Sequence, residues 1–433
     1  MKGPPVGAIA RRLPFHYGWL IVVVAIVANT ITGGAMFWTT SVYVPAISED
    51  FGVGRTVVVA AFMIGQTVFA LAGPFVGRYI DSNGAVRVIR LSVFVAPAAL
   101  VLTSFAEAPW QLFVGWSIAS IGRTFIMPIP FNWVMTRWFE GRRRQTALGL
   151  VTVGFGLGGA TLLPLYKVLE ERTDWHTTML VSGIAVLVIQ MIAALLVRNH
   201  PADIGLRPVV SADERRLDDL PAIEWGLSAP QALRTPAFWL MSSGLMLFFI
   251  GQGSITTLAI DFFDSRNVTA GAAALSIAAL IRTIARIPIG IALGRVTRVY
   301  ALAVVVILSQ GVATLALVID PASVGLVTWV TLWGLGGAFG PMLEPLLITR
   351  TFGVRHFGAV SGSQQMVTTG GQVFGTIGGA ALYDLLGSYT LPFFIYSAGV
   401  GVGAGLVALC GMIAMRPVHQ ARLLASGRPD TAS

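Results

Sequence analysis

Charged residues and cysteine are scarce in this chain of 433 residues. Charged side chains make up 11% of the sequence and hydrophobic side chains 55%, whereas soluble globular proteins carry roughly a quarter charged residues. So few charges cannot cover a soluble surface, and a lipid bilayer must therefore surround most of the chain. Cys410 is the single cysteine, which excludes an internal disulfide framework and any cysteine-based metal cluster. The composition predicts an integral membrane protein.

Lysine and histidine are also rare, and their positions exclude several kinds of active site. The two lysines, Lys2 and Lys167, belong to no Gly-Lys-Ser/Thr phosphate loop, so ATP is not an energy source encoded in this chain. The five histidines lie near the ends of hydrophobic segments or in polar stretches, which excludes a histidine relay inside the membrane. The sequence also contains no Gly-x-Ser-x-Gly elbow and no cluster of metal-ligating residues. We therefore expect a protein that is not an enzyme and that binds no metal or other cofactor.

Long hydrophobic runs dominate what is present. A helix needs about 20 apolar residues to cross the hydrocarbon core. Twelve runs of this kind lie near 17–43, 56–77, 88–106, 111–135, 146–168, 177–197, 237–260, 272–293, 299–319, 325–348, 359–382 and 391–415. Arg11 and Arg12 precede the first run, but no clear small-residue cleavage site follows it, so we expect an uncleaved first helix. The glycine runs at 154–159 and 334–337 lie inside such helices without a preceding strand, which favours close helix packing over dinucleotide binding.

The arginines are distributed very unevenly over the loops between these runs. Of the 29 basic residues, 22 lie on the side that would hold both termini, four lie on the other side, and three lie inside spans. Because basic residues concentrate on the cytoplasmic side of membrane proteins, this pattern predicts that both termini are cytoplasmic. It also explains the net charge of +9 as a matter of topology, so we expect no nucleic-acid partner.

The two halves of the chain resemble one another weakly but in order. Shifting the first half by about 213 residues places the segment 136–139 (TRWF) on 349–352 (TRTF) and Arg142 on Arg355. Parallel halves of this kind are typical of alternating-access carriers, in which the substrate site lies between the halves near the midplane. We therefore expect an all-α membrane protein with twelve transmembrane helices in two pseudo-symmetric six-helix bundles. Its expected parts are an N-terminal bundle (1–197), a cytoplasmic linker (198–235), and a C-terminal bundle with a short cytoplasmic tail (236–433).

The loop between the second and third runs resembles the signature loop of the major facilitator superfamily. It reads GRYIDSNGAVR over residues 77–87. The resemblance implies the fold of that superfamily and a latch at the cytoplasmic ends of the helices, made by Asp81 with basic residues such as Arg87. Ser82 stands where the superfamily usually has a further basic residue, which implies a weaker latch. Within the superfamily the chain is most similar to the monocarboxylate and oxalate/formate transporter group, at residues 16–19 (HYGW), at 128–164 with Arg142, and at 382–389 (LYDLLGSY).

Two arginines inside the eighth run are the strongest candidates for substrate binding. Arg282 and Arg286 are one helical turn apart, so they share a face of the helix near the middle of the membrane. Neighbouring cations repel each other unless an anion joins them, and a guanidinium group binds a carboxylate well. In the group that the chain resembles, the position of Arg286 is implicated in binding the substrate carboxylate, and Arg282 replaces an aspartate. This replacement implies a more negatively charged substrate or anion exchange. The alternative is that one arginine pairs with a fixed carboxylate.

The other polar residues inside the runs allow more than one role. Glu344 is a candidate proton carrier or the partner in a gating ion pair, and its position near Arg350 favours the pair. Arg123 in the fourth run is a candidate contact for the anion, or it packs against helix ends or lipid headgroups. Six further residues are candidates for lining the substrate cavity, although each also fits a hydrogen bond between helices: Asn29, Trp38, Tyr43, Gln66, Asn132 and Gln252.

The sequence therefore favours a secondary carrier of a small organic anion, a mono- or dicarboxylate, in a bacterial-type inner membrane. It would work by alternating access, either coupled to protons or as an anion exchanger, and as a monomer because one chain contains both halves. The alternative within carriers is efflux of an amphipathic drug or metabolite, which the 24 phenylalanines and 11 tryptophans favour. A membrane sensor or an integral enzyme fits less well, since the soluble segments are short and no nucleophile with a base is visible.

Overall fold

The computed structural model describes residues 14–210, 225–386 and 388–416, apart from some side chains within 256–264, at 272 and within 376–384. Every regular element in these ranges is a helix. The chain divides into two compact units. Unit 1 comprises Met1–Ala222 with Gly290–Arg295, and unit 2 comprises Ile223–Ile289 with Val296–Ser433. Of the expected linker, residues 211–224 lie outside the described residues, as do 1–13 and 417–433 of the expected cytoplasmic termini.

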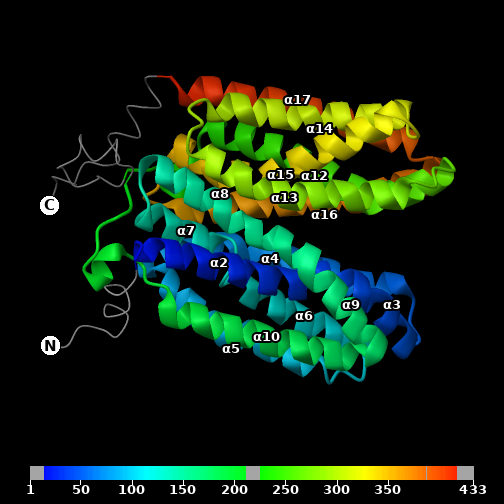
Figure 1. Cartoon of the computed structure of the whole chain (residues 1–433), viewed down its shortest axis with the longest axis horizontal. Helices are drawn as coiled ribbons and strands as arrows, with labels where there is room; N and C mark the ends of the chain where they lie inside the picture. Colours follow the sequence, from blue (N-terminus) through cyan, green and yellow to red (C-terminus); the bar gives the residue numbers. More distant parts are fainter. Residues whose placement is uncertain (1–13, 211–224, 387, 417–433) are drawn as a thin grey trace. The chain divides into compact units, whose positions relative to one another are not determined.

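Unit 1 contains the first six expected spans (Figure 1). Its elements are α2 (Tyr17–Gly33), η1 (Gly34–Trp38), α3 (Thr40–Asp50), α4 (Arg55–Asn83), α5 (Ala85–Thr103), α6 (Pro109–Thr124), α7 (Ile129–Trp138), α8 (Gly141–Leu157), η2 (Gly158–Leu162), α9 (Leu163–Arg172), α10 (Trp175–Leu196) and η3 (Pro201–Ile204). The fourth span, expected as one helix over 111–135, is divided into α6 and α7. Pro128 and Pro130 lie at this break, where the missing N–H groups of proline cannot continue the helical hydrogen bonding.

Unit 2 contains the remaining spans, except that the last four residues of α13, from Gly290 on, belong to unit 1. Its elements are α11 (Ala229–Leu233), α12 (Pro236–Ser265), α13 (Gly271–Leu293), α14 (Val299–Ile319), α15 (Val324–Phe352), α16 (Phe357–Leu386) and α17 (Thr390–Ala414). Within the described residues, eleven helical stretches are long and apolar enough to cross a membrane, and they coincide with eleven of the twelve expected spans. The twelfth, 359–382, lies in α16, a helix of 30 residues that is not among the eleven.

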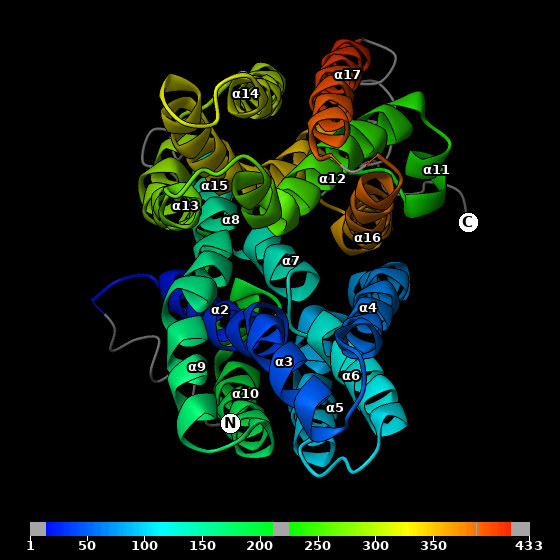
Figure 2. The ribbon, with the colours of Figure 1, turned by 90° about the vertical axis from the view of Figure 1, so that its right-hand side faces the viewer.

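Corresponding helix pairings occur in both units, whose helices Figure 2 views end on. In unit 1, α2 packs against α8 and α10, and α5 packs against α6 and α10. In unit 2, α12 packs against α16 and α17, and α14 packs against α15 and α17. Each of these pairings in unit 1 matches the pairing in unit 2 between the spans that come six later in the chain. The weak internal repeat of the sequence is therefore accompanied by repeated helix packing.

Two spans of unit 1 contain a wide π-helical turn, and the two turns lie against each other. They are η1, between α2 and α3, and η2, between α8 and α9. Glycines permit the contact, because a methyl group added at Gly158 would lie 2.8 Å from the backbone nitrogen of Gly34 and 2.6 Å from the carbonyl oxygen of Thr30. The glycine run at 154–159 therefore serves the close packing of helices that its sequence context indicates.

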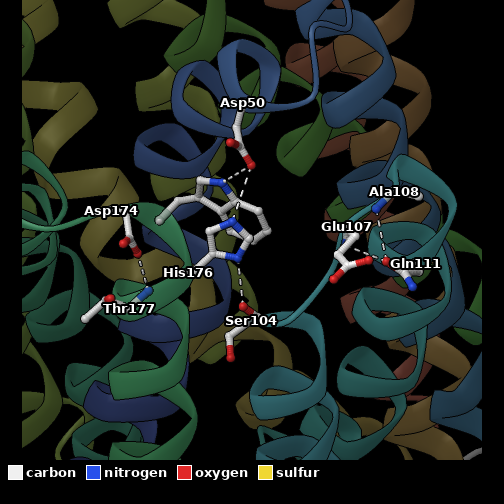
Figure 3. A network of polar contacts seen from close by, with 9 residues as sticks. Asp50, Ser104, Glu107, Ala108, Gln111, Asp174, His176 and Thr177 are labelled. Carbon is white, nitrogen blue, oxygen red and sulfur yellow. Dashed lines mark hydrogen bonds and ion pairs between the residues drawn. The ribbon is translucent and has the colours of Figure 1, made fainter.

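At one end of unit 1, a cluster of polar and aromatic side chains joins the end of α3 to the start of α10 (Figure 3). Asp50 Oδ2 accepts a hydrogen bond from Trp175 Nε1 at 3.0 Å and lies 3.3 Å from His176 Nε2. The other ring nitrogen of His176 lies 2.8 Å from the carbonyl oxygen of Ser104, in the segment that follows α5. Asp174 caps α10 by accepting from the backbone N–H of Thr177 at 2.5 Å. The cluster fixes the relative positions of three helix ends.

Candidate functional site

Unit 1 contains a buried cation that is surrounded by neutral groups. Arg123 is 4% exposed and lies in the middle of the stretch Pro109–Trp138. Its Nη2 donates to Gln66 Oε1 of α4, and its Nη1 lies 3.4 Å from the carbonyl oxygen of Met36 in η1. The guanidinium carbon also lies 3.9 Å from the centre of the Phe69 ring, which is a favourable cation–π arrangement. None of these partners neutralises the charge of Arg123.

Unit 2 contains a second cation with a neutral partner. Arg282 lies near the middle of α13, and its Nη2 donates to Gln252 Oε1 of α12 at 2.9 Å. The amide nitrogen of Gln252 donates to Gln310 Oε1 of α14. Gln310 Nε2 in turn donates to the carbonyl oxygen of Leu332 in α15 at 2.7 Å. A continuous chain of hydrogen bonds therefore connects Arg282 to three other helices, α12, α14 and α15, and none of its members is a carboxylate.

Two glycines of α15 make room for this chain of side chains. A methyl group added at Gly337 would lie 2.4 Å from Arg282 Nε, and one added at Gly336 would lie 1.8 Å from Gln310 Nε2. Gly334, one turn earlier, allows α13 to approach, since a methyl group there would lie 2.9 Å from the carbonyl oxygen of Ala278. The glycine run at 334–337 thus accommodates both a neighbouring helix and the buried polar side chains.

Arg286, the second arginine of α13, is almost completely buried, with 2% of its side chain exposed. It follows Arg282 by four residues on the same helix, as the sequence requires. The two side chains therefore place two positive charges within one turn of a membrane-spanning helix, which is costly unless negative charge is supplied.

Three of the six residues expected to line a cavity form hydrogen bonds between helices of unit 1. Asn29 Nδ2 donates to the carbonyl oxygen of Val151 at 3.0 Å, and Trp38 Nε1 donates to that of Phe155 at 2.9 Å. Tyr43 is fully buried, and its hydroxyl lies 3.0 Å from Ser182 Oγ. Their partners are fixed protein groups, which is the alternative role that the sequence allows for them.

The remaining members of this set differ in their surroundings. Gln66 and Gln252 bind the arginines described above, so both lie at the candidate sites. Asn132 of α7 is buried, and its Oδ1 accepts no hydrogen bond from the residues that the structure describes. Glu344 of α15 is partly buried and forms no ion pair or hydrogen bond within the described residues. The expected ion pair of Glu344 is therefore not observed among them.

The signature loop is held by contacts within unit 1. Asp81 Oδ1 accepts from Trp133 Nε1 of α7 at 3.0 Å, and Arg87 Nη1 donates to Asn83 Oδ1 at 3.0 Å. Gly84 adopts a φ of 82°, which favours glycine, and its backbone abuts the side chain of Asn199. Arg142 lies in the first turn of α8 and is exposed.

Sequence reasoning did not select Gln310, although it links Gln252 to α15. A signal was present, because Gln310 is an amide in the middle of an otherwise apolar span and polar residues there are rare. What the sequence lacks is the partner: nothing in the run 299–319 indicates that this amide meets the one in α12.

The fold and the buried arginines define a multi-pass membrane transporter, and comparisons with known proteins identify its family. The profile of the Major Facilitator Superfamily matches residues 25–376. The chain belongs to this superfamily. Its structure is also similar to that of the human organic anion transporter MFSD10, with a TM-score of 0.66 and 12% identity, over 93% of this chain and 100% of that one. As a transporter of this superfamily, the protein is not an enzyme; such proteins carry small molecules across a lipid bilayer.

Individual relatives are distant. The chain is 27% identical over 380 residues to an uncharacterised 38 kDa protein of Thermoproteus tenax, covering 87% of this chain and 91% of that one. It is 24% identical to monocarboxylate transporter 13 of Bos taurus, covering 90% and 88%. It is 21% identical to the oxalate:formate antiporter of Oxalobacter formigenes, covering 65% of this chain and 62% of the antiporter. The resemblance to the monocarboxylate and oxalate/formate group is therefore confirmed.

Proposed function

We propose that this protein is a secondary active transporter of a small organic anion, a mono- or dicarboxylate, that works by alternating access. Arg282 and Arg286 are its primary anion-binding groups, with Arg123 as a further cationic contact. Asn29, Trp38, Tyr43, Gln66, Asn132 and Gln252 contribute to the cavity or to its packing. Glu344 serves coupling, and Asp81, Arg87 and Arg142 serve the latch of the cytoplasmic ends. The transporter functions as a monomer in a bacterial-type inner membrane.

One observation carries this proposal. Arg282 lies in the middle of a membrane-spanning helix and donates to an amide oxygen, and within the described residues no carboxylate pairs with it. A charge in this place is expensive in the hydrocarbon and is kept where it has a function. A substrate carboxylate supplies the missing negative charge and can accept two parallel hydrogen bonds from a guanidinium group.

The known proteins that the chain resembles support the same class of substrate. They include an antiporter of oxalate and formate, transporters of monocarboxylates, and an organic anion transporter. Both coupling to protons and exchange of anions are consistent with this set. The distribution of arginines over the loops supports cytoplasmic termini, and the repeated helix pairings support two six-helix bundles, 1–197 and 236–433, joined by a cytoplasmic linker.

Uptake of radiolabelled oxalate, formate, lactate and succinate into proteoliposomes tests the proposal. Arg282→Ala should lower the transport efficiency for the preferred anion on the order of 100-fold, because removing one partner of a desolvated charge pair costs about 3 kcal/mol. Arg282→Lys keeps the charge but loses the planar fork, so it should retain part of the activity. The matched control is Arg55→Ala, an exposed arginine at the start of α4.

Two results would contradict the proposal. One is that the unaltered protein transports none of the four anions. The other is that Arg282→Ala transports the preferred anion as efficiently as the unaltered protein. Export of an amphipathic compound in place of anion transport would then be the better account.

A further inference from the structure

The chain of hydrogen bonds from Arg282 to Leu332 has a fixed direction. A guanidinium group can only donate, and a backbone carbonyl oxygen can only accept. Arg282 at one end and the carbonyl of Leu332 at the other therefore leave one orientation for each amide between them. Gln252 must present its oxygen to Arg282 and its nitrogen to Gln310, and Gln310 must present its nitrogen to Leu332. The orientation follows from the network itself and not from an arbitrary choice of amide rotamer.

The same arrangement restricts where the guanidinium group can point. Its Nη2 is held by Gln252, and its Nε faces the backbone of α15 at Gly337, where even a methyl group would be 2.4 Å away. Nε is also buried and has no hydrogen-bond partner among the residues that the structure describes. The two N–H groups of Nη1 and the second N–H of Nη2 are the donors left for a ligand. Gln252, Gln310 and the two glycines thus hold one edge of the guanidinium group in place.

The partner of Arg282 is an amide, and this determines the net charge of the pair that a ligand meets. An amide oxygen satisfies a donor without changing the net charge of the pair, whereas a carboxylate in the same place would neutralise it. A fixed carboxylate next to Arg282 would also compete with a substrate carboxylate for the same donors. The neutral partner keeps the full positive charge available to a ligand.

We propose that Gln252 and Gln310 are positioning residues for Arg282 and that the amide at position 252 sets the preference for more highly charged anions. Gln310 anchors Gln252 to α15, Gln252 fixes the guanidinium edge, and Gly336 and Gly337 provide the space. This inference rests on the proposed function, because it assigns the selectivity of the same anion site. It predicts that the chemistry at position 252 determines the preference between substrates of different charge, and not only the affinity for each of them.

Proteoliposome transport of oxalate, a dianion, and formate, a monoanion, tests this with three variants. Gln252→Glu places a carboxylate against Arg282 and should raise the KM for oxalate on the order of 100-fold and the KM for formate on the order of 10-fold, with the maximal rate changed much less. Gln310→Leu removes the anchor and should raise both KM values equally, on the order of 10-fold. Gly337→Ala should do the same by displacing the guanidinium group.

Gly405→Ala is the matched control for Gly337→Ala, since Gly405 lies in a helix of the same unit and no atom of the described residues lies within 4 Å of the added methyl group. All variants are compared at equal amounts of folded protein, judged by gel filtration in detergent. If Gln252→Glu does not fold, Gly337→Ala still tests whether the position of Arg282 matters, because this substitution introduces no charge.

The outcomes separate this inference from the function on which it rests. If Arg282→Ala abolishes oxalate transport while Gln252→Glu, Gln310→Leu and Gly337→Ala leave both KM values unchanged, the positioning role is wrong and the anion carrier stands. If Gln252→Glu raises both KM values by the same factor, position 252 does not set the charge preference. If Arg282→Ala itself leaves oxalate and formate transport unchanged, the proposed function fails first.

Discussion

Glu344 lies between Pro341 and Pro345 in α15. Neither proline can donate a backbone hydrogen bond, so the helix around this carboxyl group is less completely bonded than the rest of α15. Since Glu344 has no ion pair within the described residues, its protonation is not tied to a neighbouring cation there. Of the two roles considered for it, proton carrier is the one that these surroundings favour.

Replacing Glu344 by glutamine tests this role. If the group carries the coupled proton, Glu344→Gln should abolish the stimulation of uptake by a pH gradient while exchange of anions at equal pH continues, because the amide cannot release a proton. The measurement is initial uptake into proteoliposomes with and without an inwardly directed proton gradient. Glu107→Gln, an exposed carboxyl group outside the spans, is the control. Unchanged stimulation in Glu344→Gln would exclude it as the carrier.

At the scale of single residues, the sequence predicts charges well and hydrogen-bond partners poorly. Arg123 and Arg282 stand out in a sequence because a charge in an apolar run is rare whatever its neighbours are. Asn29 and Gln252 look alike in sequence, since both are amides within a span. The structure separates them: one donates to a backbone carbonyl of α8, and the other accepts from an arginine. That difference depends on which helices meet, and no pattern in a single run records it.

At the scale of elements, the start of α10 depends on a carboxylate outside the membrane-spanning helix. The hydrogen bond from the backbone N–H of Thr177 lowers the pKa of Asp174 from its ordinary value, and this outweighs the opposing effect of its slight desolvation. Because the folded protein favours the ionised form, the stabilisation by this cap is present above the ordinary pKa of about 4. It is lost as the pH falls through the lower pKa of the folded state.

Substitution at the cap should therefore distinguish the charge of Asp174 from its oxygen. Asp174→Ala should lower the free energy of unfolding by about 1 kcal/mol at neutral pH, whereas Asp174→Asn keeps a good capping acceptor and should cost only a few tenths. The measurement is thermal unfolding in detergent, at neutral pH and again near pH 3, where the difference between the unaltered protein and Asp174→Asn should shrink. Glu49→Ala, exposed and close in sequence to Asp50, is the control. Equal losses in the two Asp174 variants would show that the cap acts through its charge and not through its acceptor oxygen.

The length and position of the helices follow largely from the hydrophobic runs, but their interruptions do not. Apolar side chains mark where lipid or another helix must lie, and eleven expected spans coincide with helices on this basis. The π-helical turns η1 and η2 have no such signal in the sequence, because Gly34 and Gly158 are as compatible with an uninterrupted α-helix as with a π-helical turn. They arise where two backbones press together, which is a property of the pair of helices.

At the scale of the whole molecule, the charge asymmetry of the loops makes a prediction about sidedness. Cys410 is fully buried, and its Sγ donates to the carbonyl oxygen of Ala237 at 3.4 Å, so it should not react with a membrane-impermeant thiol reagent. Cysteines introduced singly at two exposed positions can then be compared, Glu107 in the loop before α6 and Arg143 at the start of α8. Glu107→Cys should be labelled in intact cells, and Arg143→Cys only after permeabilisation. The reverse pattern would contradict cytoplasmic termini.

The contact between η1 and η2 has a consequence for how this family is aligned. Each π-helical turn accommodates about one residue more than an α-helical turn, so everything beyond it is rotated by about 100° relative to an uninterrupted helix. A deletion of one residue at Gly34 alone would carry Tyr43 to another side of its span while Tyr166, beyond η2, stayed in place. We expect gaps at these two positions to occur together in related sequences. Losing only one of the two wide turns would rotate the rest of that span relative to the span it contacts.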